Sequence, residues 1–164
     1  MLDAAGLIEK HRGKDALVDA NLSGAALVGH INRRRIRDFK RRENFTIEDF
    51  DLLNRLINRF GKLIATPHVL SQVSDLTDLS GRELLQIRQL FKLVVEKLEE
   101  FYDRSAMLVS DPTFERLGLT DAAIAAVCSR GILVVTADVD LQLAVQRRGA
   151  DALNFNHVRQ LSWN

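Results

Sequence analysis

The stretch that decides the fold is ILVVTADVD, residues 132–140, where an apolar run ends in a threonine and two aspartates. A short, continuous apolar run of this kind is typical of a strand that is buried on both faces of a sheet. Four other short runs are expected to form strands: DALVDAN (15–21), KLIAT (62–66), AMLV (106–109) and DALNF (151–155). The stretch at 132–140 therefore raises a question, because a buried strand has no structural need to end in paired carboxylates.

Helical patterns separate these runs. Helix starts are signalled where a capping residue precedes apolar residues at helical spacing, and helix ends where a glycine follows them. The expected helices are 22–39, 46–61 with Thr46 and Asp49 at its start, 67–76 with Thr66 and Pro67, 81–101 with Ser80 and Glu83, 121–130 between Thr120 and Gly131, and 140–148 before Gly149. Strands that alternate with helices predict a three-layer α/β sandwich with a central, mainly parallel sheet flanked by helices.

Composition favours one compact domain over residues 1–164. Apolar residues make up 46% and charged residues 27%, with two prolines and nine glycines, which is unlike a disordered or linker-rich chain. No stretch is long enough to cross a bilayer, and MLDAAGLIEKHRGKD at the start lacks the apolar core of a secretory signal. The single cysteine, Cys128, has no partner for an internal disulfide, so a reducing cytoplasm is the expected location.

Three aspartates are predicted to meet at one edge of the sheet. Asp19 ends the first strand, Asp138 ends the strand of residues 132–137, and Asp121 begins a later helix. The carboxyl ends of parallel strands share an edge, and two unit charges about 4 Å apart there repel by roughly 4 kcal/mol at an effective dielectric near 20. No lysine or arginine lies within two residues of any of the three, so a divalent cation is expected, and oxygen ligands favour Mg²⁺ or Mn²⁺. Taken singly, each aspartate could instead cap a helix.

At this point the sequence resembles the PIN domain family of metal-dependent nucleases. The resemblance rests on LVDAN (Asp19, Asn21), TPHVLSQVSDL (66–76), LGLTDAAIAAVC (Asp121) and LVVTADVDL (Thr136, Asp138, Asp140), in that order over residues 15–156. It implies an endoribonuclease in which Asp19, Asp121 and Asp138 hold one or two Mg²⁺ or Mn²⁺ ions and a metal-bound water attacks the phosphodiester. Many members are toxins of toxin–antitoxin pairs, which implies a small antitoxin or other protein partner.

The departure from the family pattern is Gln72, where a glutamate is expected. An amide keeps one neutral oxygen but removes a negative charge, so metal affinity should fall. Three interpretations remain open: a naturally weakened or inactive nuclease, a rewired site that uses Asp75 or Asp140, or a deliberate substitution at residue 72. The alternative function is that of a degenerate PIN domain that binds RNA or a protein partner without cutting. A phosphatase of the haloacid-dehalogenase type is disfavoured because it requires an aspartate at the position of Asn21.

Several neighbours are candidate supporting residues. Asn21 and Thr136 are expected either to orient the carboxylates by hydrogen bonding or to serve as ordinary strand-end and cap residues. His68, one helical turn before Gln72, is either a polar residue at a helix start or a contact to substrate.

Two further features bear on partners. RRRIRDFKRR (33–42) holds seven basic residues and is either a solvated segment or a surface for RNA phosphates, through Arg33, Arg34, Arg35, Arg37, Lys40, Arg41 and Arg42. The helix from Ser80 to Phe101 carries more apolar residues than one buried stripe requires. This predicts either a homodimer through that helix or its deep burial within the monomer.

Overall fold

The structure, a computed structural model, describes residues 1–39 and 45–161 of the chain. The strands are β1 (Ala16–Val18), β2 (Leu63–Ala65), β3 (Glu99–Glu100), β4 (Leu133–Thr136) and β5 (Ala152–Asn154). The helices are α1 (Ala4–Lys10), α2 (Ala20–Ile31), the 3₁₀ helix η1 (Arg33–Asp38), α3 (Ile47–Ile57), α4 (Pro67–Leu76), α5 (Gly81–Lys97), α6 (Ser105–Leu108), α7 (Pro112–Leu117), α8 (Leu119–Cys128), α9 (Val139–Arg147) and α10 (Phe155–Leu161).

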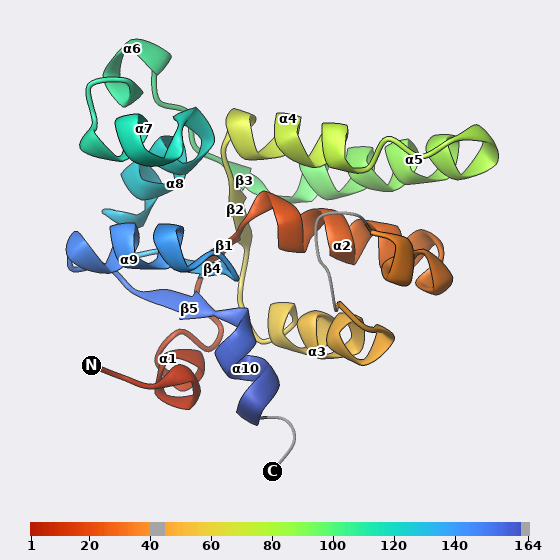
Figure 1. The fold of residues 1–164 in the computed structure, drawn as a ribbon, viewed down its shortest axis with the longest axis horizontal. Helices are drawn as coiled ribbons and strands as arrows, with labels where there is room; N and C mark the ends of the chain where they lie inside the picture. The colour runs from red at the N-terminus through yellow and green to blue at the C-terminus, as the bar shows by residue number, and fades with distance from the viewer. Residues whose placement is uncertain (40–44, 162–164) are drawn as a thin grey trace.

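Within the described residues the five strands form one parallel sheet in the order β3-β2-β1-β4-β5. Helices α2, α3, α4 and α5 lie on one side of the sheet and α6 to α9 on the other, so the molecule has three layers (Figure 1). This topology confirms the predicted α/β class with a parallel sheet flanked by helices, and it is consistent with a PIN-like arrangement.

The core follows the two central strands. Every residue of β1 and β4 is buried, and Leu17 pairs in register with Val134 between them. Apolar residues of α2, α3 and α8 close over the two faces, which is why the short strands contain almost no polar residue before their carboxyl ends. The polar residues that do occur at those ends are therefore placed on one edge of the sheet.

The third strand is not where the sequence predicted it. AMLV (106–109) falls in the short helix α6, and the strand that pairs with β2 is Glu99–Glu100, inside the range expected to be helical through Phe101. Helix α5 ends at Lys97, and the Phe101 amide then donates to the Ala65 carbonyl of β2. A two-residue, exposed edge strand made of glutamates has no apolar run, so its sequence carries no strand signal.

Helix starts were predicted with mixed success. The capping box of Thr46 and Asp49 and the N-cap Thr66 are confirmed. Ser80 makes no side-chain capping bond, so the capping box expected with Glu83 is not formed, and the Glu83 carboxylate pairs with Arg35.

Helix α8 begins at Leu119 after Gly118, so Thr120 lies inside the helix and does not cap it. Gly118 has φ +92°, a conformation that favours glycine, and the chain can turn there two residues earlier than a Thr120 cap would allow. The helix expected over 22–39 likewise breaks at Asn32 into α2 and η1.

Helix α5 is not deeply buried. Ile87 is its buried residue among those described, whereas Leu85 and Leu93 are 60% and 54% exposed. The expectation of deep burial within the monomer is therefore wrong, and the homodimer alternative stays a prediction. Within the described ranges, no helix combines the length and apolar character needed to cross a membrane.

Candidate metal centre

Asp19 and Asp138 occupy equivalent places at the ends of neighbouring strands. Asp19 follows β1 and caps α2, its Oδ1 accepting from the Leu22 amide at 2.9 Å. Asp138 follows β4 by one residue and caps α9, its Oδ1 accepting from the amides of Asp140 at 2.8 Å and Leu141 at 3.3 Å. The capping role and the strand-end role that the sequence offered as alternatives thus coexist in both residues.

Thr136 joins these two aspartates. It is fully buried as the last residue of β4, its hydroxyl donates to Asp19 Oδ2, and its Oγ1 accepts from the Asp138 amide at 3.0 Å. One hydroxyl therefore fixes the side chain of Asp19 and the backbone of Asp138. This is the orienting role for which Thr136 was a candidate.

Asp121 lines the same pocket as Asp19, but it comes from helix α8 on the other side of the sheet. A small pocket of about 100 Å³ is lined by Asp19, Ala20, Asn21, Gln72, Asp121, Ile124, Asp138 and Leu141. Its lining comes from α2 and α4 on one side of the sheet and from α8 and α9 on the other, and α4 packs against α8 across the sheet edge (Figure 1). The pocket is thus the point where the two helical layers meet.

Burial and the charges of neighbouring carboxylates act together in this pocket. Burial, followed by the negative charges of Asp138 and Asp19, raises the pKa of Asp121 to about 6. No lysine or arginine is among the lining residues, and the buried Oδ1 of Asn21 has no hydrogen-bond partner within the described part of the chain. A cation would relieve the repulsion among the carboxylates and give the Asn21 oxygen a partner.

The donor chemistry fits a hard cation, but the spacing is incomplete. Carboxylate and amide oxygens are the ligands that Mg²⁺ and Mn²⁺ prefer. Over residues 1–39 and 45–161, however, no group of three or more His, Cys, Asp or Glu side chains forms a set that could hold a metal ion. The three aspartates share a pocket and influence one another's charge without being arranged as a full ligand set.

Not every candidate residue reaches the pocket. Asp75 and Asp140 are exposed and neither lines it, so the structure does not bring a replacement carboxylate to Gln72. His68 is half-buried, and its Nδ1 has no hydrogen-bond partner within the described residues, but it is not part of the lining.

Sequence reasoning missed the apolar part of the lining. Ala20, Ile124 and Leu141 complete the pocket. The available signal was spacing, because Ile124 and Leu141 each lie three residues after an aspartate on the same helix face.

The basic segment lies away from this pocket. Lys40, Arg41 and Arg42 fall outside the described residues, and Arg33 to Arg37 form η1 beyond the far end of α2, about 18 Å along the helix from Asp19. Arg33 pairs with Asp51 at 2.8 Å and Arg35 with Glu83 at 3.0 Å.

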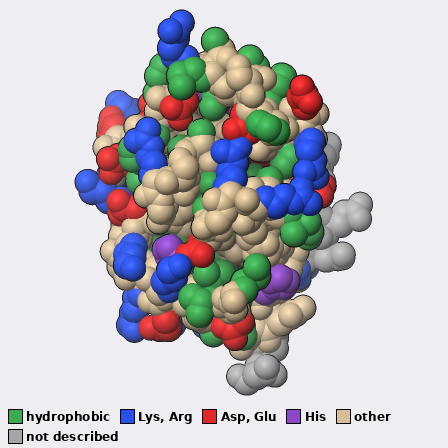
Figure 2. All heavy atoms as spheres, turned by 90° about the vertical axis from the view of Figure 1, so that its left-hand side faces the viewer, with side chains coloured by type: hydrophobic (Ala, Val, Ile, Leu, Met, Phe, Trp, Pro, Cys, Tyr) green, Lys and Arg blue, Asp and Glu red, His purple; other side chains and the backbone are tan. Residues whose placement is uncertain are grey.

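The face of the molecule on which α6 to α9 lie carries both basic and acidic side chains. Figure 2 shows the side of the molecule on which α6 to α9 lie, with lysine and arginine scattered among acidic residues. On that face, the described residues therefore form no continuous basic track.

Comparison of the chain with family models, with curated proteins and with solved structures finds no match.

Proposed function

We propose that this chain is an Mg²⁺- or Mn²⁺-dependent endoribonuclease of the PIN type whose cation site is weakened by Gln72. The observation that carries the proposal is the shared pocket: Asp19, Asp121 and Asp138, far apart in the chain, converge there with Gln72. Asp19 is buried and Asp121 half-buried, and negative charges brought together at such a place are costly unless they serve a bound cation or a reaction.

The roles of the chain's own residues follow from their contacts. Asp19 and Asp138 are held by helix caps and by Thr136, so their carboxylates are fixed before any ligand arrives. Burial and the charges of Asp138 and Asp19 raise the pKa of Asp121 to about 6, so a cation bound beside it would relieve the cost of its negative charge. A divalent ion held by the three aspartates would supply an activated water and neutralise charge on the phosphodiester.

Gln72 lowers the negative charge of the pocket. It lines the pocket at the position where the family resemblance expects a glutamate, and it offers an amide oxygen in place of a carboxylate. One unit charge about 4 Å from a divalent ion contributes several kcal/mol at an effective dielectric near 20, of which part is offset by less repulsion among the aspartates. Weak metal binding is the expected result.

The choice of RNA as substrate and a small antitoxin partner rest on the family resemblance, and the cytoplasmic location rests on the single cysteine and the sequence of the N-terminal segment. The described arginines of η1 that are exposed and lie outside the ion pairs, Arg34 and Arg37, are the candidates for contacts with the RNA backbone. An RNA strand that is bound at the pocket would follow α2 to reach them.

The test is cleavage of labelled RNA in Mn²⁺ by the purified chain, by Gln72→Glu and by Asp138→Asn. We expect weak cleavage by the unchanged chain, at least about tenfold faster cleavage by Gln72→Glu, and none by Asp138→Asn or with a chelator present. Equal cleavage by all three proteins would mean a contaminating nuclease and would end the proposal.

A second candidate, a non-catalytic RNA- or protein-binding module, is favoured by the incomplete ligand set. It predicts that the unchanged chain binds RNA without cutting it. Cleavage by Gln72→Glu alone would identify such a module, and metal-independent RNA binding with no cleavage by any variant would do so as well.

A further inference from the structure

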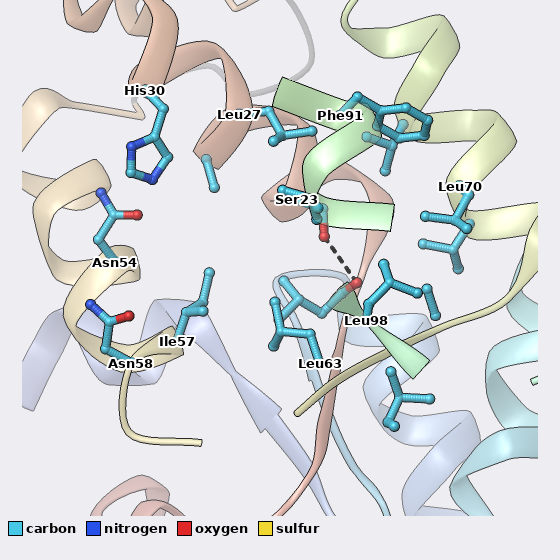
Figure 3. A pocket seen from close by; sticks show the side chains of 17 residues that line it. Ser23, Leu27, His30, Asn54, Ile57, Asn58, Leu63, Leu70, Phe91 and Leu98 are labelled. Atoms are coloured by element: carbon cyan, nitrogen blue, oxygen red, sulfur yellow. Dashed lines mark hydrogen bonds between the residues drawn. The ribbon is translucent and has the colours of Figure 1, made fainter. Parts of the chain in front are cut away.

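A second, larger cavity lies on the α2–α5 side of the sheet and plays no part in the proposed nuclease. Its volume is about 280 Å³. Its floor is formed by β1 and β2 through Val18, Ile64 and Ala65, and its walls by α2, α3, α4 and α5 (Figure 3). Because regular elements form all its sides, the cavity is a built feature of the fold and not a gap under a loop.

The lining divides into a polar end and an apolar end. His30 of α2, Asn54 of α3 and Asn58, which follows α3, gather at one end, whereas Leu70 of α4 and Phe91 of α5 lie at the other (Figure 3). Ser23, between them, is already engaged, since its hydroxyl donates to the Val18 carbonyl at 3.1 Å. The hydrogen-bonding capacity available to an occupant is therefore concentrated at the end with the histidine and the two amides.

We propose that this cavity binds a small, uncharged amphiphile with an apolar body and one hydrogen-bonding head, such as a hydroxyl or an amide. A cavity of about 150 Å³ accepts benzene, so one of this size suits a molecule of about ten non-hydrogen atoms. The apolar end accommodates the body, and the imidazole and the two amides can both donate to and accept from the head.

The charge of the lining residues and the volume of the cavity restrict the class of ligand further. No Asp, Glu, Lys or Arg is among the described residues that line the cavity, so a charged head would have no ion-pair partner there. The volume is too small for a helix or strand of a partner protein, although it could admit one protruding side chain. A small neutral ligand fits both constraints, and the proposal stands independently of the nuclease activity.

The experiment is a titration of the ¹³C-methyl-labelled full chain with 1-octanol, with octanoate and toluene as comparators. We expect saturable shifts at the methyl groups of Leu27, Leu70 and Leu98, with a Kd on the order of 0.1–1 mM. Octanoate should bind at least about tenfold more weakly because its head is charged.

Variants locate the binding. Leu70→Trp fills the apolar end and should abolish the shifts. If circular dichroism shows that Leu70→Trp is unfolded, Val94→Phe, which fills the cavity from α5, is used as the filled variant. Asn54→Leu should weaken octanol binding but not toluene binding. Leu93→Trp, an exposed position on the same helix α5 that does not line the cavity, should change neither.

Three results would overturn the proposal: no saturation with any of the probes, binding that survives in both filled variants, or octanoate that binds as tightly as octanol. If none of the probes saturates, the cavity could accept at most one side chain of a protein partner.

Discussion

Asp121 is the residue that best predicts how stability depends on pH, because burial and neighbouring negative charges both act on its carboxyl group. Burial and the nearby charges of Asp138 and Asp19 raise its pKa to about 6 from the ordinary 3.8. Its charged form is thus disfavoured in the folded protein, and stability should fall as pH rises from about 3.8 to about 6. Because the group is partly exposed, we place the cost of its charge at about 1–2 kcal/mol.

The corresponding prediction is that Asp121→Asn stabilises the protein at about pH 8 by about 1–2 kcal/mol, and that this gain disappears near pH 3.8. Urea denaturation at both pH values measures it. Asp140→Asn is the matched control, since Asp140 also lies in the first turn of a helix but is exposed and outside the pocket. A gain at pH 8 that equals the gain at pH 3.8 would show that charge repulsion is not its source.

Much of the pocket could be predicted at the scale of residues. The rule that parallel strands end at one edge placed Asp19 and Asp138 together, and the helix after Gly118 brought Asp121 to them. What the sequence could not show is which neighbours turn inward. Asp75 and Asp140 lie within three residues of pocket residues, yet the helix rotation leaves both exposed.

The basic segment shows the same limit. Arg33 and Arg35 are paired with Asp51 and Glu83, which are 18 and 48 residues away in the chain. Such pairs depend on tertiary packing, so a count of local charge overstates how much of it is available to RNA.

At the scale of elements, α2 matters most because it contributes to both cavities. Its first turn lines the acidic pocket, and its later turns line the apolar cavity. Helix α2 packs closely on α3 at Gly29, where a Cβ atom would lie 2.3 Å from two ring carbons of Phe50. The Phe50 ring is 3% exposed and cannot easily move aside.

We therefore expect Gly29→Ala to destabilise the protein by about 1–3 kcal/mol through overpacking, despite the better helix propensity of alanine. Gly24→Ala in the same helix is the control, because its nearest contact would be 3.2 Å, to Phe39. That variant should be within about 1 kcal/mol of the unchanged protein. Urea denaturation compares the two, and equal stability would mean that α2 and α3 are less tightly packed than the structure shows.

The apolar pattern of the sequence predicted most strands, but not all of them. The strands β1, β2, β4 and β5 are buried apolar runs, and each was found from sequence. AMLV (106–109) is also apolar, but only Leu108 of α6 is buried, so local hydrophobicity did not correspond to a sheet position. The apolar cavity was not foreseen, since it results from how four helices are spaced over β1 and β2.

At the scale of the whole molecule, the acidic pocket joins the two helical layers across one edge of the sheet. Gln72 comes from the α2–α5 side, and Asp121 and Asp138 come from the α6–α9 side (Figure 1). A cation that binds these residues would connect the layers, so the stability of the domain should depend on metal concentration.

We expect about 10 mM Mn²⁺ to raise the Tm of the unchanged chain by at most about 1–2 °C, because a ligand near its Kd adds less than about 1 kcal/mol. Gln72→Glu should have a lower Tm without metal, owing to added repulsion. It should gain several degrees in Mn²⁺, since a hundredfold excess over Kd adds about 2.7 kcal/mol.

Ser74→Glu places the same charge on an exposed position of α4 and should gain nothing. Differential scanning calorimetry with Mn²⁺ and then with a chelator makes the measurement. If Gln72→Glu and Ser74→Glu respond alike, the pocket does not bind the ion and the metal-dependent mechanism fails with it.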